Sequence, residues 1–155
     1  MLVRRAEQKD IPKITELLNQ VLDVHHRARP DIFKANCRKY TVSELEEILA
    51  DDQKPVFVAD DGEVLGYAFC KIEQHLNDNI LTDIKTLYID DLCVDKSARG
   101  KHIGKFLFEY VKEYAKSIDC YNLTLNVWNG NFDAIKFYEK CGLTPQKFGM
   151  ETILK

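Results

Sequence analysis

Residues 87–104 read L-Y-I-D-D-L-C-V-D-K-S-A-R-G-K-H-I-G, and the architecture follows from this stretch. Its first half predicts a buried strand whose alternation is interrupted: apolar residues stand at odd positions at Leu87 and Ile89 but at even positions from Leu92 onward. One extra residue is therefore inserted between the two sets. The simplest account is a β-bulge, which bends a strand and frees backbone N–H and C=O groups for a ligand.

The second half, R99-G-K-H-I-G, is a glycine-bearing turn between this strand and a helix expected over 103–118. A helix N-terminus offers unpaired N–H groups and the positive end of the helix dipole, so such a turn is typical of a phosphate site. A P-loop is excluded because the G-K-S/T ending is absent, and a dinucleotide fingerprint is excluded because G-x-G-x-x-G is missing. His102 stands at a position where a further glycine would be expected, because glycine adopts the backbone conformations of such a turn more easily. It is tolerable with a negative φ or in the left-handed conformation, which histidine visits.

The composition predicts one soluble globular domain over residues 1–155. The chain is 45% hydrophobic and 30% charged, with no low-complexity tract or Pro/Gly/Ser-rich linker. Its net charge of -3 disfavours nucleic acid as a partner, because nucleic acid is normally met by a basic face. There is no signal-peptide core and no run of about 18 apolar residues, so we expect a cytoplasmic protein without a membrane partner. Five cysteines without a C-x-x-C pair indicate reduced thiols and no metal site.

Periodicity and turn signals place the other elements. Two helices are expected in the N-terminal third, the first capped by Asp10 and the second starting at Thr41 or Ser43. The D61-G62 pair predicts a hairpin turn, and Asn131 caps a later helix. Strands are expected at 2–6, 55–60, 63–74, 87–94 and 122–127, and once or twice within 147–154. This order predicts an α+β sandwich with a mixed sheet inside and helices outside.

The stretch from Leu87 to Leu143 resembles the acetyl-CoA-binding half of the Gcn5-related N-acetyltransferases, the GNAT family. Three features carry the resemblance: the strand ending D90-D-L-C-V-D, the turn R99-G-K-H-I-G, and the segment N129-G-N-F-D-A-I-K-F-Y-E-K-C-G-L. The turn is similar to the family's Arg/Gln-x-x-Gly-x-Gly/Ala loop, with a histidine at the first required glycine. The resemblance implies a three-layer α/β/α sandwich whose central sheet is mixed, mostly antiparallel, and bulged in its fourth strand.

The resemblance also implies an acyltransferase with acetyl-CoA as cosubstrate and no metal. We expect an N-acetyltransferase that transfers acetyl from acetyl-CoA to a primary amine of a small molecule, by direct attack in a ternary complex. Two alternatives stay open: a protein N-terminal or lysine acetyltransferase, and a non-catalytic regulatory module that binds acyl-CoA. The resemblance is compatible with a homodimer formed through the C-terminal strands. The sequence does not identify the amine acceptor.

The resemblance assigns three catalytic candidates. Asp90 takes a proton from the acceptor ammonium group, with Asp91 as the second choice, and Tyr138 protonates the departing thiolate. Without the resemblance, core packing would explain Tyr138, and solvated charge at a strand end would explain the aspartates. No Cys-His pair is visible, so Cys93 is interpreted as a small buried residue rather than a nucleophile.

The remaining site predictions concern the cosubstrate and the acceptor. The pyrophosphate of acetyl-CoA is expected at the turn, and backbone N–H groups freed by the bulge are expected to polarise the thioester carbonyl. The expected cofactor-binding residues are Leu92, Cys93, Val94, Arg99, Gly100, Lys101, His102, Ile103, Gly104, Lys105, Asn131 and Phe137. The resemblance places the acceptor pocket near the end of the first helix, at His25, His26 and Arg29. At least one of these histidines is expected to be structural.

Overall fold

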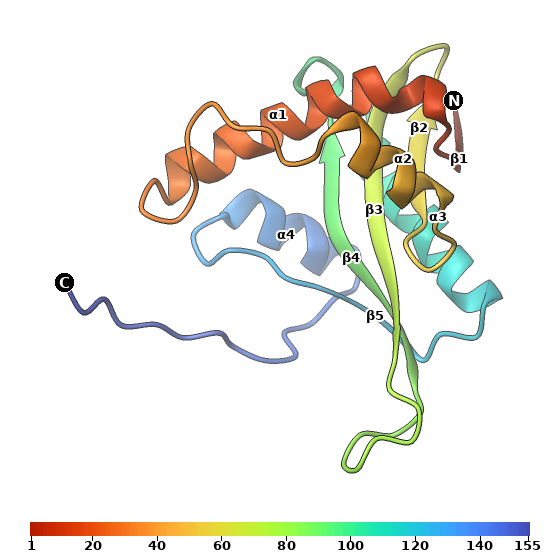
Figure 1. Cartoon of the computed structure of the whole chain (residues 1–155), viewed down its shortest axis with the longest axis vertical. Coiled ribbons are helices and arrows are strands. Elements are labelled where there is room, and N and C mark those ends of the chain that lie inside the picture. Colours follow the sequence, from red (N-terminus) through yellow and green to blue (C-terminus); the bar gives the residue numbers. More distant parts are fainter.

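A five-stranded sheet forms the middle of the molecule, and its strands lie side by side in chain order. The computed structural model describes residues 1–155 (Figure 1). The strands are β1 (Leu2–Arg5), β2 (Val56–Asp60), β3 (Val64–Gln74), β4 (Lys85–Val94) and β5 (Asn122–Leu125). Neighbouring strands are antiparallel from β1 to β4, whereas β5 runs parallel to β4. The predicted mixed, mostly antiparallel sheet is confirmed.

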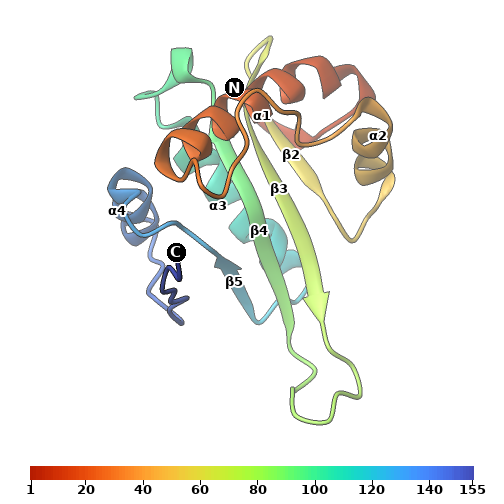
Figure 2. The ribbon, with the colours of Figure 1, turned by 60° about the vertical axis from the view of Figure 1, so that its left-hand side comes forward.

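Helices cover both faces of the sheet, as predicted. They are α1 (Ile11–Ala28), α2 (Val42–Ala50), α3 (Ile103–Ser117) and α4 (Phe132–Lys140), with short 3-10 turns η1 (Gln8–Asp10) and η2 (Lys96–Ala98). Figure 1 shows α1 and α2 in front of the strands and α3 behind them, and Figure 2 shows the same layers from the side. One apolar cluster joins α1 and α2 to the sheet through residues such as Ile14, Leu45 and Phe69. A second cluster joins α3 to the opposite face, and side chains of α4 pack against it.

The interrupted alternation in β4 corresponds to a β-bulge. Phe69 of β3 faces Asp91, but the next residue of β3, Cys70, faces Ile89. Asp90 is therefore the extra residue, which has no partner in β3. Ile89 on one side of the bulge and Leu92 on the other both contact the cluster beneath α3. The change of parity read from the sequence thus keeps both apolar sets on one face.

Strands β4 and β5 pair only over their first halves. Their register runs from Thr86 opposite Asn122 to Ile89 opposite Leu125, and it ends at the bulge. From Asp90 to Val94 the edge of β4 that faces β5 has no neighbouring strand. Beyond the bulge the two strands no longer pair, and the backbone groups along this edge of β4 have no partner strand. The region between the two strands beyond the bulge is called the opening below.

Two expectations about local structure were wrong. Residues 144–155 form neither a helix nor a strand, so the final strands expected within 147–154 are absent, and this tail runs away from the sheet (Figure 1). An alternating sequence still needs a neighbouring strand for its backbone hydrogen bonds, and the chain places none beside the tail. Asp10 does not cap α1 with its side chain. Its carboxylate instead accepts hydrogen bonds from Arg4 and from the backbone N–H of Glu7. None of the helices combines the length and apolar character that crossing a membrane requires.

Candidate active site

Asp91 lies at the bulge with its carboxylate turned to the face covered by α1 and α2. The hydroxyl of Tyr67, on β3, donates a hydrogen bond of 2.7 Å to Oδ2 of Asp91. Burial raises the pKa of Asp91, while the hydrogen bond from Tyr67 and the charges of Lys39 and His25 oppose the rise. A carboxylate held in this way is a stronger base than an exposed aspartate.

Asp90, the neighbouring carboxylate, has a different environment. Its side chain is 23% exposed and lies 3.7 Å from Nζ of Lys39 and 3.9 Å from Nζ of Lys71. These distances indicate loose ion pairs with little geometric constraint. The two aspartates therefore differ: the half-buried carboxylate of Asp91 accepts a hydrogen bond from a buried hydroxyl, whereas Asp90 lies beside two lysines.

Tyr138, on α4, lies near enough to Asp91 and Cys93 for their charges to affect its hydroxyl. Its ring packs against Phe108 at 6.4 Å and against Phe137 at 5.2 Å between ring centroids. Burial raises the pKa of Tyr138, and the negative charge of Asp91 raises it further. No group of the chain hydrogen-bonds its hydroxyl. The phenol is therefore protonated at neutral pH and free to donate to a ligand.

Cys93 is buried and follows the bulge on β4. Its Sγ contacts the carbonyl oxygen of Leu17 at 3.8 Å and that of Val94 at 3.7 Å. Burial raises the pKa of Cys93 to about 12. The thiol is therefore un-ionised at neutral pH, which agrees with its interpretation as a small buried residue rather than a nucleophile.

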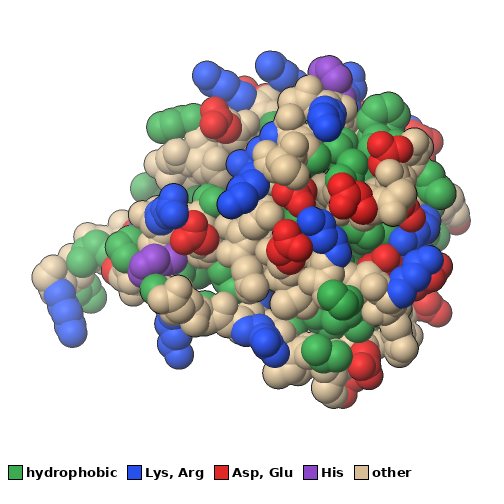
Figure 3. All heavy atoms as spheres, turned by 90° about the horizontal axis from the view of Figure 1, so that it is seen from above, with side chains coloured by type: hydrophobic (Ala, Val, Ile, Leu, Met, Phe, Trp, Pro, Cys, Tyr) green, Lys and Arg blue, Asp and Glu red, His purple; other side chains and the backbone are tan.

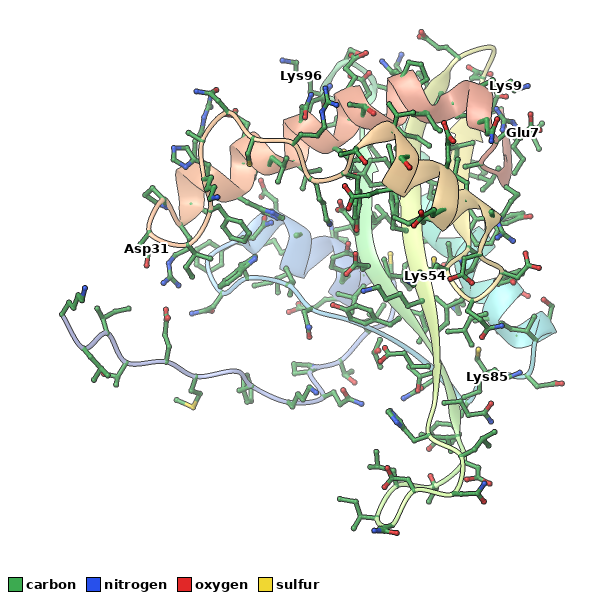
Figure 4. The ribbon with its side chains drawn as sticks, viewed as in Figure 1. Glu7, Lys9, Asp31, Lys54, Lys85 and Lys96 are labelled. Carbon is green, nitrogen blue, oxygen red and sulfur yellow. The ribbon has the colours of Figure 1, made fainter.

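The turn after β4 is tied to α1 by a buried carboxylate. Asp95 accepts hydrogen bonds from Nζ of Lys13 at 2.6 Å and from the backbone and hydroxyl of Ser97 at 3.0 Å each. Gln20 accepts a hydrogen bond from the backbone N–H of Lys96 at 3.1 Å, and Figure 4 shows Lys96 beside α1. The pair with Lys13 lowers the pKa of Asp95 below its usual range. The start of the turn is thus fixed to the helix that also carries His25.

His102 adopts the left-handed conformation, with φ of 62° and ψ of 19°. Gly100, two residues earlier, also has a positive φ of 83°. These two residues bend the chain so that α3 starts directly at Ile103. His102 therefore adopts the left-handed conformation, one of the two that the sequence analysis allowed for it. The side chains of Arg99, Lys101 and Lys105 around this turn are exposed.

Two predicted cofactor-binding residues have packing or capping roles in this structure. A Cβ atom on Gly104 would lie 3.3 Å from Cζ of Phe137, so the glycine allows α3 and α4 to approach each other closely. The side chain of Asn131 accepts a hydrogen bond from the backbone N–H of Ala134 at 3.4 Å and caps α4, as the sequence predicted. The backbone N–H groups of Leu92, Cys93 and Val94 lie in the segment of β4 that has no neighbour toward β5.

The end of α1 and the loop after β5 meet through aromatic side chains. The ring of His25 lies 4.9 Å from that of Phe33, which meets Trp128 edge-on at 5.7 Å. Burial lowers the pKa of His25, so its ring is largely neutral at pH 7. Nδ1 of His26 lies 2.8 Å from the carbonyl oxygen of Phe33, so this ring is tied to the loop that follows α1.

Arg29 is held by acidic partners rather than left free. It forms ion pairs with Asp31 at 2.7 Å and with Glu151 of the tail at 2.6 Å, and its guanidinium lies 5.8 Å from the ring centre of Trp128. Figure 4 shows Asp31 in the loop that follows α1. Seen from above, basic and acidic side chains are interspersed and neither sign dominates (Figure 3). Such a surface does not favour a polyanionic partner.

The sequence analysis missed Tyr67, Lys39 and Trp128. Tyr67 reaches Asp91 only because of the register between β3 and β4, and the sequence carries no signal for that register. Lys39 lies in an irregular loop, where spacing predicts no contact. Trp128 stands close to the Asn131 cap, and an exposed tryptophan in a loop is the one available hint of a binding role.

Comparisons with known proteins found similar sequences and similar solved structures. The sequence profile of the Acetyltransferase (GNAT) family matches residues 15–143. The chain is 35% identical over 66 residues to the glucosamine 6-phosphate N-acetyltransferase of Arabidopsis thaliana. These 66 residues are 43% of this chain and 42% of that relative. It is 27% identical over 144 residues to the peptidyl-lysine N-acetyltransferase YjaB of Salmonella typhimurium, covering 90% of this chain and 81% of that relative.

Solved structures are similar over the whole chain. A mutant of the BH1408 protein from Bacillus halodurans has a TM-score of 0.94 and is 30% identical, with 100% of both chains covered. The glucosamine-6-phosphate N-acetyltransferase from Arabidopsis thaliana has a TM-score of 0.71 and is 26% identical, with 99% of this chain and 98% of that chain covered.

Proposed function

Since the chain belongs to the acetyltransferase (GNAT) family, we propose that it is an acetyl-CoA-dependent N-acetyltransferase that acts on a primary amine of a small molecule. We propose direct attack of the amine within a ternary complex. One observation supports this most: a half-buried carboxylate and a phenol without a hydrogen-bond partner lie near each other, beside a strand edge that has no neighbour. The left-handed turn that starts α3 follows the same strand.

The residues around the opening fit acetyl-CoA. The free edge of β4 from Asp90 to Val94 offers backbone groups that no strand uses, and the turn presents the first N–H groups of α3 to a phosphate. Exposed Arg99, Lys101 and Lys105 add positive charge there. When bound, acetyl-CoA supplies an acetyl thioester. Backbone N–H groups at the bulge would stabilise negative charge on the carbonyl oxygen during attack.

The surroundings of the two aspartates favour Asp91 over Asp90 as the base. A carboxylate with a raised pKa holds a proton more strongly and accepts one from an ammonium group more readily. Asp90, ranked first from the sequence, is 23% exposed and forms only loose ion pairs with two lysines. We therefore assign proton removal to Asp91 and assign Asp90 to attraction of the ammonium group. Tyr138 donates the proton that the departing thiolate requires.

The test is release of free thiol from acetyl-CoA with a panel of amines. The panel contains glucosamine 6-phosphate, polyamines, aminoglycosides, amino acids and lysine peptides, with a thermal shift by acetyl-CoA measured in parallel. Turnover of one small amine supports the proposal. Stabilisation by acetyl-CoA without turnover of any acceptor would favour the regulatory module, and the absence of both effects would overturn the proposal.

A lysine side chain of a peptide is the second candidate acceptor. It is favoured by the relative named a peptidyl-lysine N-acetyltransferase, which matches 90% of the chain. Against it, Lys39 and Lys71 flank Asp90 and would repel a cationic peptide segment, whereas they would attract an acceptor with an anionic group beside its amine. Comparing a lysine peptide with an amino-sugar phosphate at equal concentration separates the two.

We also propose that two copies of the chain pair through their tails. The tail exposes Phe148, Met150 and Leu154, the last two at 92% each, and β5 is an open edge of the sheet. When a second chain adds a strand to this edge, the exposed apolar surface decreases and the free backbone groups of the edge become hydrogen-bonded. The molar mass in solution, measured by light scattering with and without residues 144–155, tests this. A monomeric full-length chain contradicts it.

A further inference from the structure

Tyr67 is a buried tyrosine whose hydroxyl points at the bulge. It lies on β3 opposite Cys93 and is fully buried, at 0% exposure. Its hydroxyl reaches diagonally across the strand pair to Asp91, two residues from Cys93, and donates the 2.7 Å hydrogen bond. Diagonal contacts between neighbouring strands are within reach of an aromatic side chain. The hydroxyl therefore points at the bulge because of the register of the sheet.

The ring of Tyr67 is fixed by other aromatic rings. Phe69 meets it edge-on at 5.0 Å, and Phe69 in turn stacks on Tyr40 at 6.0 Å. Because the side chain of Tyr67 is closed off from water, turning the hydroxyl away from Asp91 would leave a buried polar group without a partner. The packing thus holds the donor in one direction.

We infer that Tyr67 is a positioning residue, whose hydroxyl fixes the Asp91 carboxylate at the bulge and stabilises its ionised form. Its catalytic meaning rests on the proposed function, since Asp91 is the base there. A hydroxyl bonds more strongly to a carboxylate than to a neutral carboxylic acid, so the contact favours the form that can accept a proton. The hydroxyl thus opposes the rise in the pKa of Asp91 that burial causes.

Other titratable groups also face Asp91, but none of them hydrogen-bonds it. His25 from α1 and Lys39 from the following loop favour the ionised form, and Asp90 opposes it. The un-ionised side chains of Tyr40, Cys93 and Tyr138 complete the surroundings. Removing the Tyr67 hydroxyl therefore deletes a directional contact and leaves the neighbouring charges in place.

The first test does not depend on turnover. The titration of the Asp91 carboxyl carbon is followed by NMR in the parent chain and in Tyr67→Phe. We expect its midpoint to rise by about one to two pH units, the range for loss of a hydrogen bond to a charged group. Tyr40→Phe is the matched control, because this neighbouring tyrosine makes no hydrogen bond to Asp91. An unchanged Asp91 midpoint in Tyr67→Phe overturns the inference.

A second variant keeps the inference testable if Tyr67→Phe does not fold. Incorporation of 3-fluorotyrosine at position 67 keeps the ring in place and makes the hydroxyl a stronger donor. We expect the Asp91 midpoint to fall in that protein. A midpoint that stays in place or rises overturns the inference.

The activity test then separates the inference from the proposed function. If Asp91 is the base, the acidic limb of kcat against pH moves up in Tyr67→Phe by the same amount as the NMR midpoint, and activity recovers at high pH. A merely structural role would lower kcat equally at every pH. If the NMR midpoint moves while the acidic limb does not, the role of Tyr67 stands and the assignment of Asp91 as base fails.

Discussion

Replacing Tyr138 by Phe tests the proposed proton donor with little disturbance of the fold. The ring contacts with Phe108 and Phe137 remain, and the hydroxyl that is removed has no hydrogen-bond partner in the chain. We therefore expect the free energy of unfolding to change by less than the roughly 1 kcal/mol that a typical hydrogen bond contributes. The expected fall in kcat is about 10²-fold or more, which corresponds to about 2.7 kcal/mol in the activation barrier.

The assay is release of thiol from saturating acetyl-CoA with the best acceptor found in the panel. Affinity for acetyl-CoA, measured separately by calorimetry, should be nearly unchanged, because the missing contact forms only as the thiolate departs. Tyr114→Phe is the control: this tyrosine of α3 packs against Phe57 of β2 and has no proposed part in the chemistry. A kcat for Tyr138→Phe within about three-fold of the parent, with chemistry shown to limit turnover, refutes the donor role.

Three further changes test other parts of the structure. Because the pKa of Asp91 is raised in the folded chain, ionising this carboxyl lowers the stability of the parent as pH rises above about 4. Asp91→Asn should therefore lose activity, and its melting temperature minus that of the parent should be higher at pH 7 than at pH 4. Gly66→Ala should destabilise the fold by on the order of 1–3 kcal/mol in urea unfolding, since its Cβ would lie 2.7 Å from the backbone oxygen of Cys93. His102→Val should cost about 1–2 kcal/mol in the same measurement, because a β-branched residue tolerates the left-handed conformation poorly, whereas His102→Gly should stay within about 1 kcal/mol of the parent.

Local patterns in the sequence predicted the framework of the site. The change of parity in β4 predicted the bulge, and the bulge identified the two aspartates. The left-handed alternative for His102 also followed from the turn alone. Each of these features depends on residues within one or two turns of the chain, where steric rules and alternation act directly.

Features that depend on distant neighbours did not follow from the sequence. Tyr67 and Asp91 are 24 residues apart, and they meet only through the register of two strands. The close approach of α4 to Gly104 was not predicted either, because Phe137 lies on another helix 33 residues along the chain. The tail has the alternation of a strand, and alternation does not tell whether a neighbouring strand exists.

The strict chain order of the sheet has a consequence for how the protein assembles during synthesis. Each strand up to Val94 pairs with the strand before it, so these strands can pair before the rest of the chain has been synthesised. The opening depends on β5 and α4, which come from the last third of the chain. A nascent chain can therefore bury much of its sheet while its binding cleft is still unmade. Premature termination beyond Val94 would then leave a partly folded product that lacks the wall opposite the bulge.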